Sequence, residues 1–128
     1  MVRFALVLVF GVLAGPALAD DAPDCANQVT QMDMTQCVGL DYEKADKELN
    51  GVWKELTKPA ADRDPEFSAA ILKAQRAWIA YRDSQCAVAG FEARGGSLEP
   101  MLVGLCLAEM TRARTKALQG LVDGTENE

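Results

Sequence analysis

Apolar residues recur every three or four positions along three stretches of this sequence, and short turn signals separate the stretches. The stretches run from about Gln31 to Thr57, from about Pro65 to Ala93, and onward from Ser97. Such spacing places apolar side chains on one face of an α-helix. No β-branched alternating run of useful length accompanies it. The pattern therefore predicts an all-α fold, a three-helix antiparallel bundle with helices of roughly 25 residues.

Local signals set the expected helix ends. Thr30 followed by Asp33 forms a capping pair before the first helix, and Pro59 stops that helix. Asp64 is the expected N-cap of the second helix. Pro65 suits the first helical position, because the N–H that it lacks would have no partner inside the helix. The third helix is expected to begin after Gly95-Gly96, with Ser97 as its cap.

The first nineteen residues have the pattern of a cleaved export signal. Arg3 precedes an apolar run from Phe4 to Ala14, and the segment ends in a small-x-small pattern at Ala19. The alternative is a membrane anchor, but this run is too short to cross a bilayer, which needs ~20 residues. No cysteine follows the run directly, so a lipid anchor is not expected. We predict a signal peptide at 1–19, a domain at 20–128, and a periplasmic or secreted location.

The composition excludes several classes of protein. The absence of histidine rules out Ser-His-Asp and Cys-His catalysis and zinc sites that contain histidine. The chain has 13 Lys and Arg residues against 19 Asp and Glu, and loss of Arg3 with the signal peptide makes the net charge −7. Because nucleic-acid binding requires a basic surface, no nucleic-acid partner is expected. No metal and no cofactor is expected either.

Four cysteines remain after the predicted cleavage: Cys25, Cys37, Cys86 and Cys106. Their spacing matches neither a thiol-redox motif nor a zinc site, so an exported chain favours two structural disulfides. Four cysteines allow three pairings. Equal distances from the turns place Cys37, Cys86 and Cys106 at one level, with Cys37 at the flank of its stripe. This register favours Cys25–Cys37 and Cys86–Cys106 without excluding the other two pairings.

Polar residues interrupt the predicted apolar faces. Asp46 and Arg82 lean toward each other in an antiparallel pair, and Asn50 and Gln75 are expected to satisfy their remaining hydrogen bonds. Trp78 lies one turn before Arg82 and is expected to pack on it. One interpretation is a catalytic carboxylate beside an anion-binding arginine. The favoured one is a buried polar network that fixes the helix register.

Other charged residues are expected on solvated surfaces. Arg112, Arg114 and Lys116 form a small basic patch on the third helix, which we interpret as a solvated face. No carboxylate pair has an evident cleft, so no catalytic residue is predicted and the protein is not expected to be an enzyme.

Several short segments of the sequence, taken together, resemble one protein family. They are Cys25 with the stretch from Thr30 to Cys37, Ala45 to Asn50, Ala74 to Asp83 with Cys86, Gly95-Gly96-Ser97, Pro100-Met101, Cys106, and Thr111 to Arg114. This set is similar to the lysozyme inhibitor LprI-like N-terminal domain and covers nearly the whole predicted mature chain. The resemblance implies a small exported, disulfide-bonded helical protein of bacteria, and lysozyme inhibition for the protein that named the family.

Two functions follow as hypotheses. The first is a non-catalytic protein that binds lysozyme or another basic protein, because a net charge of −7 steers it toward strongly basic animal lysozymes. Its contact residues are not predicted, although two groups of acids are candidates: Asp62, Asp64 and Glu99 on turns, and Asp41, Glu43 and Glu48 on the first helix. The alternative is a structural or envelope-stress module that does not inhibit lysozyme.

Overall fold

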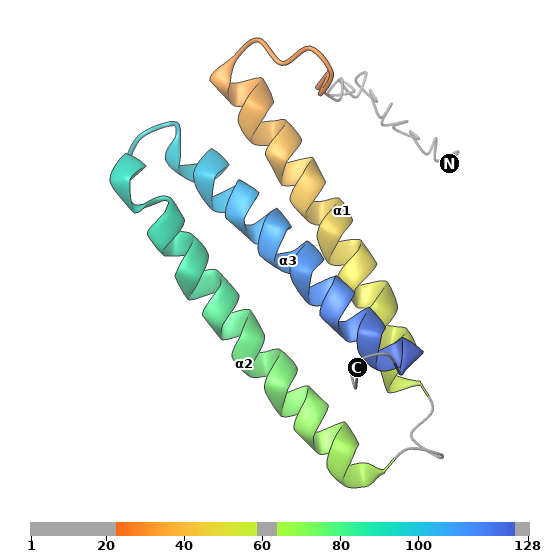
Figure 1. The fold of residues 1–128 in the computed structure, drawn as a ribbon. Helices are drawn as coiled ribbons and strands as arrows, with labels where there is room; N and C mark the ends of the chain where they lie inside the picture. Colours follow the sequence, from red (N-terminus) through yellow and green to blue (C-terminus); the bar gives the residue numbers. More distant parts are fainter. Residues whose placement is uncertain (1–22, 59–63, 125–128) are drawn as a thin grey trace, which may run out of the picture.

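The protein is described from a computed structural model that covers residues 23–58 and 64–124. The elements are helices α1 (Gln31–Thr57) and α2 (Pro65–Ala89), the short 3₁₀ helix η1 (Phe91–Ala93), and helix α3 (Glu99–Asp123). These residues contain no strand, so the predicted all-α fold is confirmed. The predicted signal peptide lies outside the described residues. Figure 1 shows α3 between α1 and α2, with α2 running antiparallel to both.

The first two helices begin where local capping signals predict. The Thr30 side chain accepts a hydrogen bond from the Asp33 backbone N–H, and the Asp33 carboxylate accepts one from the Thr30 N–H. At α2 the Asp64 carboxylate accepts from the Glu66 N–H, with Pro65 at the first helical position. Both caps satisfy N–H groups that have no partner inside the helix.

The second helix ends at Ala89, so the expected continuation to Ala93 is wrong. Gly90 lies so close to α3 that a β-carbon there would be 2.6 Å from Val103 Cγ2 and 3.2 Å from Glu99 Cγ. Because the chain passes this near α3, α2 stops and η1 makes the turn. Gly95 then adopts a φ of 79°, a conformation that favours glycine.

The predicted cap of the third helix is also wrong. The helix begins at Glu99, its N-cap is Leu98, and no side chain caps it. The Glu99 N–H instead donates to the Gly96 carbonyl at 3.3 Å, while the Glu99 carboxylate accepts from the Gly95 N–H at 2.6 Å. The Gly96 carbonyl thus accepts from the first turn of α3, where the Ser97 hydroxyl was expected to accept.

The core follows from the central position of α3. Leu49 and Leu56 of α1 pack with Leu118 of α3, and half-buried residues of α1, α2 and α3 surround them. Ala108 and Thr111 are also fully buried on α3. A central helix contacts two neighbours, so its buried surface extends beyond one stripe. Leu72 and Ile79 lie in the second apolar stretch of the sequence and Leu98 and Leu105 in the third, yet each is at least 40% exposed.

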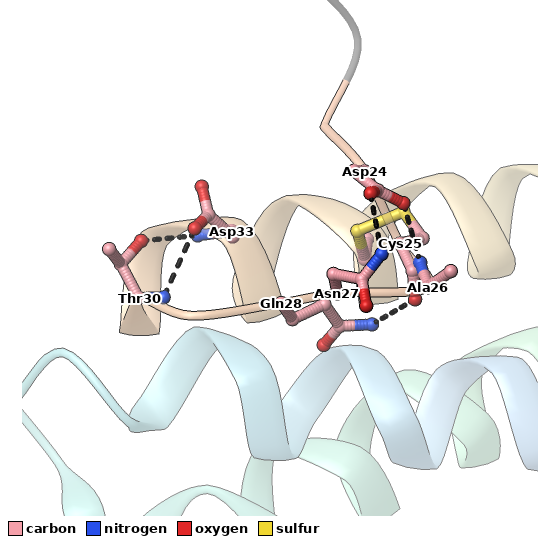
Figure 2. Close-up of a disulfide and its surroundings, with 8 residues drawn as sticks. Asp24, Cys25, Ala26, Asn27, Gln28, Thr30 and Asp33 are labelled. Carbon is pink, nitrogen blue, oxygen red and sulfur yellow. Dashed lines mark hydrogen bonds between the residues drawn. A yellow bond between two sulfur atoms is a disulfide. The ribbon is translucent and has the colours of Figure 1, made fainter.

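The two disulfides pair as the register favours, Cys25 with Cys37 and Cys86 with Cys106. Cys86–Cys106 joins α2 to α3. Cys25–Cys37 holds the leader, residues 23–30, against α1, as Figure 2 shows. Within the leader the Asp24 carboxylate accepts hydrogen bonds from the Ala26 N–H and the Asn27 side chain. The leader is therefore fixed at both of its ends, by the disulfide and by the Thr30 cap.

Candidate functional site

Arg82 occupies the centre of a polar cluster where the three helices meet. Arg82 is 7% exposed, counted over the whole residue. The guanidinium donates from Nε to the Asp83 carboxylate at 2.9 Å and from an Nη to the Thr111 hydroxyl at 3.4 Å. The Asp46 carboxylate lies 3.9 Å from the same group. Arg82 thus contacts its own helix, α1 and α3.

Aromatic rings cover the Arg82 guanidinium. Its carbon lies 5.1 Å from the centre of the Trp78 ring and 5.6 Å from that of Tyr42. A cation over an aromatic face is attracted by the electron density of the ring, and more strongly where water is excluded. Sequence reasoning included Trp78 but missed Tyr42 as a partner of Arg82.

Arg114 belongs to the same cluster, so its interpretation as part of a solvated basic patch is wrong. Its Nε donates to the Gln75 side chain at 2.9 Å, and its guanidinium lies 5.7 Å from the centre of the Trp78 ring. The sequence signal for this position is its spacing. Arg114 is four residues after Met110 and four before Leu118, so the three side chains lie on one face of the helix. Gln75 therefore binds Arg114 and not the Asp46–Arg82 pair.

Asn50 contacts Asp46 within α1. The Asn50 amide donates to the Asp46 carboxylate and to the Asp46 backbone carbonyl, each at 2.9 Å. The Asp46 side chain is 43% exposed, so this part of the cluster meets water. All five polar-core candidates, Asp46, Asn50, Gln75, Trp78 and Arg82, therefore lie in or beside one network. Through Asp46, Arg82 and Thr111 this network joins α1, α2 and α3.

The described residues contain no group of three His, Cys, Asp or Glu side chains placed to hold a metal ion. All four cysteines are in disulfides. None of the helices in the described ranges is long and apolar enough to cross a membrane.

The acidic contact candidates lie in different places. Asp62 is outside the described residues, Asp64 caps α2, and Glu99 binds the Gly95 N–H. On α1 Asp41 forms an ion pair with Arg112, and that contact together with Glu48 raises the Arg112 pKa. Glu43 and Glu48 are exposed. The five described acids thus lie in different local settings and do not form one site.

The fold and its contacts define a class: a small all-α protein whose three helices are linked by two disulfides and a polar cluster. A family profile described as Lysozyme inhibitor LprI matches residues 23–118. The chain belongs to the LprI lysozyme inhibitor family. Membership of this family, together with the disulfides, indicates an extracytoplasmic protein.

A close relative extends the resemblance over almost the whole sequence. The chain is 46% identical over 133 residues to Uncharacterized protein R02472 of Rhizobium meliloti (strain 1021), a match that covers 96% of each chain. A comparison with solved structures finds no match.

Proposed function

We propose that this protein is a periplasmic or secreted inhibitor that binds lysozyme without catalysing a reaction. The observation that carries the proposal is the family match over residues 23–118, which spans α1, α2 and most of α3. The excess of acidic residues supports it, because animal lysozymes are strongly basic and opposite charge raises the rate of encounter.

The arginine cluster supports binding over chemistry. Arg82 directs its hydrogen bonds to Asp83 and Thr111, and the Trp78 ring lies over it. A residue held in this way stabilises the helix packing and leaves recognition to surface residues.

Inhibition can be measured directly. The protein, purified after export so that its disulfides are formed, is added at micromolar concentration to bacterial walls lysed by an animal lysozyme or by a bacterial lysozyme. We expect slower lysis at low salt and a weaker effect at high salt, since the attraction between net charges is screened. Unchanged lysis with both enzymes at low salt contradicts the proposal and favours a structural or envelope-stress module.

A further inference from the structure

Charge is distributed unevenly along the bundle. We call residues 23–43 and 81–111 the disulfide half, because both disulfides lie in it, and the other described residues the opposite half. The disulfide half contains eight carboxylates and two arginines, an excess of six negative charges. The opposite half contains nine cationic side chains and six carboxylates, an excess of three positive charges. Among the described residues, the disulfide half therefore has a net negative charge and the opposite half a net positive one.

Ion pairs within the described residues neutralise little of this negative charge. Of the two arginines in the disulfide half, Arg82 is buried against Asp83, and Arg94 lies over the Phe91 ring at 4.4 Å. Six carboxylates of this half take part in none of the ion pairs found in the described residues: Asp24, Asp33, Glu43, Glu92, Glu99 and Glu109. Hydrogen bonds from Asn27 and Ala26 lower the Asp24 pKa, and those from Thr30 lower the Asp33 pKa.

Exposed apolar side chains gather in the same half. Among the described residues, five large apolar side chains are more than half exposed: Val29 at 85%, Met32 at 77%, Val88 at 66%, Tyr81 at 58% and Phe91 at 55%. All five belong to the disulfide half. Apolar side chains that stay exposed in one part of a protein supply the kind of contact that interaction sites use.

A groove lies at the end of this half, between the beginnings of α1 and α3. Its volume is about 640 Å³, and it is lined by hydroxyl and amide side chains of α1 with Met32, Ser97 and Pro100. Both disulfides fix the surrounding backbone, one holding the leader on α1 and the other holding α2 on α3. Little ordering is then needed on binding, which favours affinity.

We propose that the disulfide half is the docking surface for a cationic protein whose lysine and arginine residues surround an apolar contact. The carboxylates attract such a surface, and Met32, Val88 and Phe91 supply the apolar area. Anionic membranes and nucleic acids are repelled by the same charge. For lysozyme as the partner the inference rests on the proposed function; the surface itself does not.

The charge part is tested with two triple variants that have the same net charge. The first, Glu43→Gln with Glu92→Gln and Glu109→Gln, neutralises the disulfide half. The matched control, Glu48→Gln with Glu55→Gln and Glu66→Gln, neutralises the opposite half. With hen egg-white lysozyme and with cytochrome c as two basic proteins, we expect the first to lower the association rate at low salt about tenfold and the control to change it less than twofold.

The apolar part is tested in the same way. Met32→Ser with Val88→Ser is expected to raise the dissociation constant about tenfold, whereas Leu72→Ser with Ile79→Ser in the opposite half leaves it within twofold. Circular dichroism and a thiol count confirm that each variant is folded and oxidised. Backbone amide shifts of the ¹⁵N-labelled wild type during titration with each basic protein locate the contact.

The outcomes separate this inference from the proposed function. Binding of cytochrome c through residues 23–43 and 81–111, without inhibition of lysozyme, supports the docking surface and contradicts the proposed function. Inhibition of lysozyme with amide chemical-shift changes confined to the opposite half supports the proposed function and contradicts the docking surface. Equal effects of the matched variants, or no binding of either basic protein at low salt, overturn the inference.

Discussion

Gly104 of α3 lies directly against Val38 of α1, so that a β-carbon at position 104 would be 2.6 Å from Val38 Cγ1. Two non-bonded carbon atoms cannot lie this close together, so one of the two helices or the Val38 side chain would have to move. The missing side chain at position 104 therefore lets α3 approach α1 near the level of the disulfides. A small residue of this kind gives no apolar signal in the sequence, yet it sets how tightly two helices pack.

Gly104→Ala is expected to destabilise the protein by about 1–3 kcal/mol, because the added methyl group overpacks the α1–α3 contact. Chemical denaturation monitored by circular dichroism measures the change. Gly51→Ala is the matched control, since a β-carbon at that helical position meets nothing within 4 Å. The control should gain stability, up to about 1 kcal/mol, from better helix propensity.

Adding Val38→Ala to Gly104→Ala makes room for the new methyl group. We expect the double variant to be more stable than the sum of the two single changes predicts. Additive effects would show that position 104 does not act through Val38.

Arg82→Ala is expected to cost about 3 kcal/mol, since it removes a buried side chain from between Trp78 and Thr111 and leaves Asp83 without its partner. Asp46→Asn is expected to cost less than about 1 kcal/mol, because Asp46 lies 3.9 Å from Arg82 and its side chain is 43% exposed. Urea unfolding of both variants and of the double variant gives the coupling energy. A larger loss for Asp46→Asn than for Arg82→Ala would contradict this order.

What could be predicted from the sequence was local or covalent. Thr30 and Asp64 cap α1 and α2 through hydrogen bonds within a few residues, so both helices begin at the predicted residues. Equal distances to the turns favoured the disulfide pairing that the structure has, although they left the other two pairings open. These features depend on neighbours in the chain and require no knowledge of which helix lies in the middle.

The rest depended on tertiary packing. On the central helix α3, Ala108 and Thr111 are buried while Leu105 is 46% exposed, an order that hydrophobicity along the sequence does not predict. Arg114 was misassigned for the same reason, since its partners Gln75 and Trp78 are on α2. Likewise, the concentration of acids in the disulfide half becomes visible only when residues 23–43 and 81–111 are placed side by side.

The disulfide Cys25–Cys37 is expected to be reduced before Cys86–Cys106. Cys25 is exposed, whereas Cys86 is fully buried and the Met110 sulfur lies 3.6 Å from it and 3.8 Å from Cys106. A reductant must reach a sulfur atom to attack it. Alkylation and mass spectrometry during mild reduction give the order, and earlier labelling of Cys86 or Cys106 would refute it.

The paired replacement Cys86→Ala with Cys106→Ala is expected to destabilise the bundle by about 3 kcal/mol, given the 20-residue separation and the loss of a link between α2 and α3. Cys25→Ala with Cys37→Ala releases the leader alone and should cost less. Urea unfolding of both variants compares them, and a greater loss for the Cys25–Cys37 replacement would contradict the expected ranking.

Asp33 should make the stability of the protein depend on pH through the cap of α1. The hydrogen bonds from Thr30 lower the Asp33 pKa below its ordinary value of 3.8, so the carboxylate is stabilised in the folded state. A lowered folded pKa contributes stability that is fully present above 3.8 and is lost as the pH falls through the folded pKa. The stability difference between wild type and Asp33→Asn should therefore be constant near neutral pH and shrink below 3.8.

Urea unfolding at several pH values measures this stability difference. Thr30→Ala is the second variant, because it removes the hydrogen-bond partner and keeps the carboxylate, and it is expected to cost about 1 kcal/mol. A difference that stays constant or grows as the medium is acidified would show that the capping contact does not hold the carboxylate in its charged form.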